Sequence, residues 1–124
     1  MMLLDTFAWV ELFQATNAGE KVRSIIQDRP AYTSVATLAE ITVWALRYGK
    51  DPDLFIERIE KLSSVLPLNR EILTRAGKVT HERKKDRSGF GIMDGLIYAT
   101  ARLHQLEMLT GDPHFQGLPG VVFL

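Results

Sequence analysis

The chain has 124 residues, of which 46% are hydrophobic, and its 15 basic and 15 acidic side chains cancel to a net charge of zero. This length is about that of one domain, so we expect a single folded unit over residues 1–124. No apolar run approaches the ~18 residues of a membrane span, so we expect a cytoplasmic protein without membrane contact. Because there is no cysteine, any metal must be held by oxygen or imidazole.

Short apolar segments alternate with stretches of helical periodicity along the chain. Strands are predicted at 1–4, 31–34, 65–68, 107–109 and 121–124, and helices at 7–14, 20–27, 37–48, 52–62, from 70 onward and at 93–104. Asn17-Ala18-Gly19 is predicted to break the chain between the first two helices, and Gly49 to end the third. Asp51 and Asn69 are placed to cap the helices that follow them. Since parallel strands need helical crossovers, this order predicts an α/β three-layer sandwich with a mostly parallel central sheet.

Four acidic residues stand inside apolar stretches, namely Asp5 in MMLLDTFAWV, Glu40 in VATLAEITVWAL, Asp94 in GIMDGLIYATA and Asp112 in EMLTGDPHF. A carboxylate removed from water is costly unless it is paired, hydrogen-bonded or bound to a cation. Asp5 and Asp112 follow predicted strands, so both are expected at the carboxyl edge of the sheet, where α/β proteins bind ligands. A shared divalent metal is the simplest explanation for all four acids.

Three of these acids also have a local explanation when each is taken alone. Asp5 can cap the helix that follows it, and Asp94 can interact with the dipole in the first turn of its own helix. Asp112 precedes a proline and can initiate a turn. Glu40 lies inside a predicted helix and has no such local role. One shared site is therefore the hypothesis that covers the whole set.

The segments LLDT, LAEI, IMDGLIYATA and MLTGDPHF, followed by the terminal VVFL, resemble in order and spacing the PIN-domain nucleases, and more narrowly the VapC-type toxins of toxin–antitoxin pairs. The resemblance extends from Leu3 to Leu124. It implies that the catalytic, metal-binding carboxylates are Asp5, Glu40, Asp94 and Asp112, and that the hydroxyl of Thr110 orients them. Two positions depart from the family pattern. Phe7 stands where a small polar residue often follows the Asp-Thr pair, and Gly95 stands where an alanine-like residue is common.

The resemblance further implies a metal-dependent endoribonuclease that cleaves single-stranded or structured RNA. Such a toxin would be neutralised by an antitoxin protein and would form a homodimer or a larger assembly. From the residues alone, carboxylate ligands select Mg²⁺ or Mn²⁺. Such an ion can assist the in-line attack of a water on a phosphodiester.

A basic segment precedes the third acidic motif. Residues 70–87 contain seven Lys or Arg against three acids, a local excess of four positive charges. The side chains predicted to bind RNA phosphates are Arg83, Lys84, Lys85 and Arg87. A solvated helix face explains these charges equally well.

Other classes of protein make different demands on the first acidic motif. A receiver domain needs paired acids after its first strand, and a haloacid-dehalogenase-like phosphatase needs DxD, whereas Asp5 is followed by Thr6 and Phe7. Two alternatives stay open. One is a non-catalytic PIN-like module that binds RNA or protein, and the other is a housekeeping RNA-processing nuclease.

Overall fold

The computed structural model describes residues 1–124 and contains one five-stranded sheet. The strands are β1 (Met2–Leu4), β2 (Ala31–Ser34), β3 (Ser64–Leu66), β4 (Glu107–Thr110) and β5 (Val121–Phe123). Their order across the sheet is β3-β2-β1-β4-β5, and every neighbouring pair is parallel. The predicted α/β fold with a parallel central sheet is therefore confirmed.

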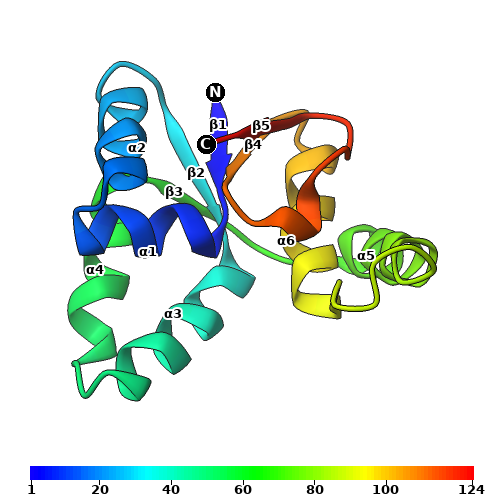
Figure 1. Cartoon of the computed structure of the whole chain (residues 1–124), viewed down its shortest axis with the longest axis horizontal. Coiled ribbons are helices and arrows are strands. Elements are labelled where there is room, and N and C mark those ends of the chain that lie inside the picture. The colour runs from blue at the N-terminus through cyan, green and yellow to red at the C-terminus, as the bar shows by residue number, and fades with distance from the viewer.

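Helices cover both faces of this sheet (Figure 1). They are α1 (Thr6–Gln14), α2 (Asn17–Gln27), α3 (Val35–Arg47), α4 (Pro52–Leu62), α5 (Arg70–Arg83) and α6 (Ile92–Leu103), with a short 3-10 helix η1 (Pro113–Phe115) before β5. Figure 1 shows α1 and α2 on one side of the sheet and α5 and α6 on the other. None of the helices has both the length and the apolar character needed to cross a bilayer.

The central strand β1 shows why the sheet needs cover on both faces. Met2 and Leu4 pack with Trp9 of α1 in one core cluster, whereas Leu3 packs with Ile97 of α6 in the other. Successive side chains of a strand point to opposite faces. All three β1 residues are buried, as expected for a parallel sheet between two helical layers.

The predicted break at Asn17-Ala18-Gly19 is wrong, because these residues form the first turn of α2. The chain turns earlier, at Ala15, which has a φ of 53°. Thr16 then caps α2 by accepting a hydrogen bond from the Gly19 N–H at 3.0 Å. A Cβ at Gly19 would lie 2.0 Å from the Glu11 carbonyl oxygen, so this glycine permits close packing of α2 on α1. Its role is tertiary contact rather than a turn.

The other predicted elements are present, and their ends either coincide with the predicted ends, as in β2 and α4, or differ by up to three residues. Helix α3 begins two residues earlier than predicted, because Ser34 accepts a hydrogen bond from the Ala36 N–H at 3.2 Å. Asp51 and Asn69 cap α4 and α5 as predicted. Gly49, with a φ of 67°, follows the end of α3. Helix η1 was not predicted from the sequence.

Candidate active site

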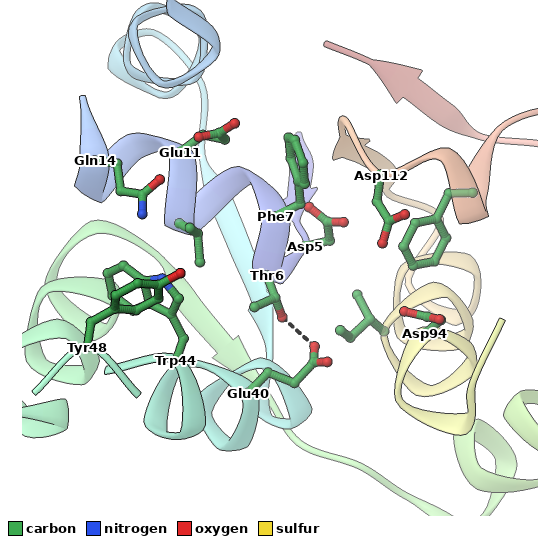
Figure 2. A pocket seen from close by; sticks show the side chains of 13 residues that line it. Asp5, Thr6, Phe7, Glu11, Gln14, Glu40, Trp44, Tyr48, Asp94 and Asp112 are labelled. Atoms are coloured by element: carbon green, nitrogen blue, oxygen red, sulfur yellow. Dashed lines mark hydrogen bonds between the residues drawn. The ribbon is translucent and has the colours of Figure 1, made fainter. Parts of the chain in front are cut away.

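The four acids predicted as a site line one cavity of about 390 Å³ at the carboxyl ends of β1 and β4. Asp5 directly follows β1, and Asp112 lies two residues beyond β4. Glu40 comes from α3, and Asp94 from the first turn of α6. Figure 2 shows the four side chains around the space between α1, α3 and α6. The structure thus brings together residues that are up to 107 positions apart in the sequence.

Asp5 is the most deeply buried of the four, with 2% of its surface exposed. One carboxylate oxygen accepts a hydrogen bond from the Ala8 N–H at 2.9 Å, which makes Asp5 the cap of α1. The other oxygen accepts a hydrogen bond from the Thr110 hydroxyl. Burial raises the pKa of Asp5 from 3.8 to about 7 against the effect of these two bonds, and the charges of Asp112 and Glu40 add to the rise. The capping role and the cavity position therefore belong to the same side chain.

Thr110 connects two of the acids. Its buried hydroxyl donates to Asp5 and accepts a hydrogen bond from the Asp112 N–H at 3.0 Å. This arrangement fixes the end of β4 relative to the end of β1, and with it the spacing of the two carboxylates. It matches the orienting role that the sequence resemblance implied for this threonine.

Glu40 and Asp94 are half-buried and each accepts one hydrogen bond. The Thr6 hydroxyl donates to Glu40 Oε1 at 2.6 Å (Figure 2), and the Gly91 N–H donates to Asp94 Oδ2 at 2.9 Å. Burial is the main cause that raises the pKa of both carboxyls, and the charge of Asp112 raises both further. Thr6 was not singled out from the sequence, although a hydroxyl directly after Asp5 was the available signal.

No lysine or arginine forms an ion pair with any of the four acids. The one basic side chain next to them is His114, whose Nδ1 lies 3.0 Å from Asp112 Oδ1. Glu40 Oε2, Asp94 Oδ1 and Asp112 Oδ2 receive no hydrogen bond from the protein. The cavity therefore presents carboxylate oxygens whose charge is not neutralised by the protein.

The oxygen atoms of this cavity suit the divalent ion that the sequence predicted. Carboxylate and hydroxyl oxygens are the ligands that Mg²⁺ and Mn²⁺ prefer. No three acidic or histidine side chains converge into a ready-made metal-binding group. Mg²⁺ usually keeps several waters and is held by only one or two carboxylates, so acids that line one cavity without touching fit a hydrated ion. The residues are chemically compatible with such an ion.

The basic segment divides into two kinds of side chain. Arg83 donates from Nε and Nη2 to the His114 carbonyl at 3.3 and 3.1 Å, and from Nη2 also to the Gln116 carbonyl. Arg87 donates to the Pro113 carbonyl at 2.8 Å. These two predicted RNA-binding residues therefore hold the turn that follows Asp112.

The two lysines between these arginines are exposed. Lys85 pairs with Glu82 at 3.1 Å on the same helix end, and Lys84 makes one 3.4 Å contact with the Ser88 carbonyl. Such exposed contacts are weak, so both ammonium groups can exchange them for phosphate. Counting charges along the sequence could not separate these lysines from the arginines beside them.

A parallel α/β sandwich with an acidic cavity at its carboxyl edge defines the general class of this protein. The family model of the PIN domain matches residues 2–121, so the chain belongs to the PIN domain family. The resemblance predicted from the order of the acidic motifs is confirmed. No protein among those with curated descriptions matches the sequence significantly.

Solved structures with similar folds include components of toxin–antitoxin complexes. A chain of a toxin–antitoxin complex from Klebsiella pneumoniae is 26% identical, with a TM-score of 0.77 over 98% of this chain and 96% of that one. A chain of FitAcB from Neisseria gonorrhoeae is 25% identical, with a TM-score of 0.72 over 100% and 97%. VapC20 from Mycobacterium tuberculosis, described as a sarcin-ricin loop cleaving toxin, is 18% identical with a TM-score of 0.77 over 98% and 97%. The similarity to VapC20 concerns the fold alone.

Proposed function

We propose that this protein is a metal-dependent endoribonuclease and the toxin of a toxin–antitoxin pair. The observation that carries the proposal is the set of four carboxylates, without a lysine or arginine partner, around one cavity of a PIN domain. The similarity to a chain from a toxin–antitoxin complex supports the biological context.

In this proposal Mg²⁺ or Mn²⁺ is held among Asp5, Glu40, Asp94 and Asp112, directly or through its bound waters. When bound, the ion would offset the negative charge that develops on the phosphate and would favour deprotonation of the attacking water. Thr110 keeps the carboxylate of Asp5 in one orientation, and Thr6 does the same for Glu40. The protein's own part in the reaction is thus to hold acidic oxygens at fixed positions around the scissile phosphate.

Cations and protons compete for these carboxylates. The pKa of Asp5 is raised to about 7, and those of Glu40 and Asp94 are raised as well. A carboxyl group must lose its proton to bind a metal. Activity at low metal concentration is therefore expected to rise with pH through the neutral range.

The proposed partners are an RNA substrate and an antitoxin protein. An arginine or lysine of the antitoxin can enter the acidic cavity, pair with the carboxylates and compete with the metal. Inhibition should then weaken as the Mg²⁺ concentration rises. A homodimer or a larger assembly is also part of the proposal.

The test is cleavage of single-stranded and of structured RNA by the purified protein with Mg²⁺ or Mn²⁺, and again in EDTA. Cleavage that needs the metal is the expected result. Undiminished cleavage in EDTA would refute the metal mechanism. RNA binding without cleavage would favour the non-catalytic module. Cleavage without growth arrest on expression would favour a housekeeping nuclease over a toxin.

A further inference from the structure

The cavity continues beyond the acids, along the groove between α1 and α3. This second part, here called the aromatic arm, is lined by Val10 and Gln14 of α1 and by Trp44 and Tyr48 on the α3 side. Figure 2 shows Gln14 facing the two aromatic rings across the groove, on the side of Glu40 away from Asp112. The acids and the aromatic arm form one continuous space. A ligand held at the acids therefore has room to extend into this arm.

The aromatic arm has a rigid floor. Trp44 is half-buried, and its ring centroid lies 5.1 Å from that of Phe55 and 6.2 Å from that of Phe13. Tyr48 packs against Trp44 at 6.0 Å, yet 58% of its surface stays exposed. A large aromatic side chain fixed from behind and open in front is preorganised to stack on a flat ligand.

Charge and hydrogen-bonding groups surround this ring. Lys50 Nζ lies 5.6 Å from the Trp44 ring centroid, and Arg47 lines the adjoining groove together with Trp44. Neither cation forms an ion pair within the protein. The amide of Gln14 offers both a donor and an acceptor. The rings and the amide match the base and the base edge of a nucleotide. The two cations lie beside the cavity rather than in its lining, which also includes Glu11, so they can approach only the phosphates that leave the arm.

We propose that the aromatic arm binds one unpaired nucleobase of the RNA, next to the scissile phosphate. The base stacks on Tyr48, and Gln14 contacts its edge, which gives the enzyme a preference among bases at that position. This inference rests on the proposed ribonuclease function. RNA fits better than a peptide because the arm opens directly from the site proposed for the phosphate and has unpaired cations beside it.

The experiment measures RNA affinity separately from cleavage. A short RNA that contains a wild-type cleavage site is prepared in a set in which each nucleotide near that site is made abasic in turn. Binding is followed by fluorescence anisotropy with the Asp94→Asn protein, alone and combined with Tyr48→Ala, Tyr48→Phe or Leu46→Ala. Leu46 is 63% exposed on the same helix and does not line the cavity, so it is the matched control. Melting temperatures check that each variant is folded.

The proposal predicts that one abasic position weakens binding about tenfold, the size of a single stacking contact. Tyr48→Ala should lower RNA affinity by a similar factor. In this variant, removing the base at that position should cause no further loss of affinity. Tyr48→Phe, which keeps the ring, should recover the affinity, and Leu46→Ala should change nothing. Gln14→Ala should reduce the preference among bases at that position.

Three results would overturn the inference. In the first, the wild type cleaves RNA, but Tyr48→Ala responds to each abasic RNA as the protein with Tyr48 does. The base then binds elsewhere, and only this subsite is refuted. The same conclusion follows if Tyr48→Ala weakens a protein partner while its RNA affinity is unchanged, since the arm then serves the partner. If the wild-type protein neither cleaves nor binds RNA, the proposed function fails together with the subsite.

Discussion

The acid cavity and the basic segment at residues 83–87 carry opposite charges, and the fold treats these charges in opposite ways. In the cavity, Asp5, Glu40 and Asp94 are at least half-buried, have no cationic partner, and have raised pKa values. In the basic segment, Arg83 and Arg87 donate hydrogen bonds to backbone carbonyls. The protein leaves the acids of the cavity without a lysine or arginine partner, whereas it gives two of the four basic side chains backbone carbonyls as acceptors.

The charges that have no partner within the protein are the ones available to a ligand. Buried carboxylates that repel one another are stabilised when a cation binds between them. A guanidinium group that already donates to carbonyls gains little from a phosphate, and losing it leaves those carbonyls without their donor. The two arginines therefore belong to the support of the acid cavity, because the turn they hold begins at Asp112.

The largest effect is expected when the cavity loses one charge. Asp94→Asn keeps the shape of the side chain and an oxygen that can accept from Gly91, yet removes a proposed metal ligand. The rate of RNA cleavage in Mn²⁺ should fall at least about 100-fold while RNA affinity stays the same or increases. Asp86→Asn, on an exposed residue, is the control and should keep full activity. Equal rates in the two variants would show that Asp94 is only a helix cap.

The second prediction concerns the pH dependence of stability in EDTA. The folded pKa of Asp5, about 7, lies above the unfolded value of 3.8, so the folded state binds more protons between these values. Stability should therefore fall as the pH rises from about 4 to 7 and stay low above 7. Asp5→Asn should flatten this dependence and raise the free energy of unfolding at pH 8 by up to about 4 kcal/mol, at ~1.4 kcal/mol per pKa unit.

Thermal melts at pH 5.5 and pH 8 measure this effect, and added Mn²⁺ should stabilise the wild type more than Asp5→Asn. Some pH dependence will remain in the variant because Glu40 and Asp94 also have raised pKa values. An Asp5→Asn protein with the wild-type pH dependence would show that burial of Asp5 carries no electrostatic cost.

The third prediction tests the arginines as supports of the turn. Arg83→Ala removes the hydrogen bonds to the His114 and Gln116 carbonyls and should lower the free energy of unfolding by about 1–3 kcal/mol. Arg83→Lys should recover only part of this loss, because an ammonium group cannot reproduce the fork of the guanidinium. Chemical denaturation measures both. Lys84→Ala is the neighbouring control, and a change within about 0.5 kcal/mol is expected.

The smallest effect is expected from the exposed lysines. Replacing Lys84 and Lys85 together with alanine should weaken RNA binding a few-fold at low salt and leave the melting temperature unchanged. If both contact phosphates of single-stranded RNA, the slope of log affinity against log salt should fall by up to about 1.4. Anisotropy titrations at several salt concentrations measure the slope. An unchanged slope would mark these lysines as a solvated face.

The sequence predicted those parts of the molecule that depend on local signals. Each of the caps Asp51 and Asn69 accepts a hydrogen bond from an N–H no more than three residues later, so its role can be seen in the local sequence. The acids stood out because each lies in an apolar stretch, which is also a local property. The placement of Asp5 and Asp112 at one edge followed from the rule for the carboxyl ends of a parallel sheet.

Features that depend on distant partners could not be predicted in this way. The Arg83 contacts join residues 31 and 33 positions apart, and the Thr6 contact with Glu40 spans 34. Nothing near Arg83 in the sequence distinguishes it from Lys84. The misplaced break at Gly19 has the same origin, because the reason for that glycine is the Glu11 carbonyl of another helix.

Gly95, directly after Asp94, has a consequence for how this protein can evolve. A Cβ at this position would lie 2.2 Å from Thr80 Oγ1 and 2.8 Å from the Ala76 carbonyl oxygen, on the neighbouring helix α5. A side chain at position 95 can be accepted only if the hydroxyl at position 80 is lost or turned away and α5 also moves outward, because the Ala76 carbonyl belongs to the backbone. Positions 80 and 95 should therefore covary among descendants of this sequence, and an alanine introduced at 95 alone should select for a smaller side chain at 80.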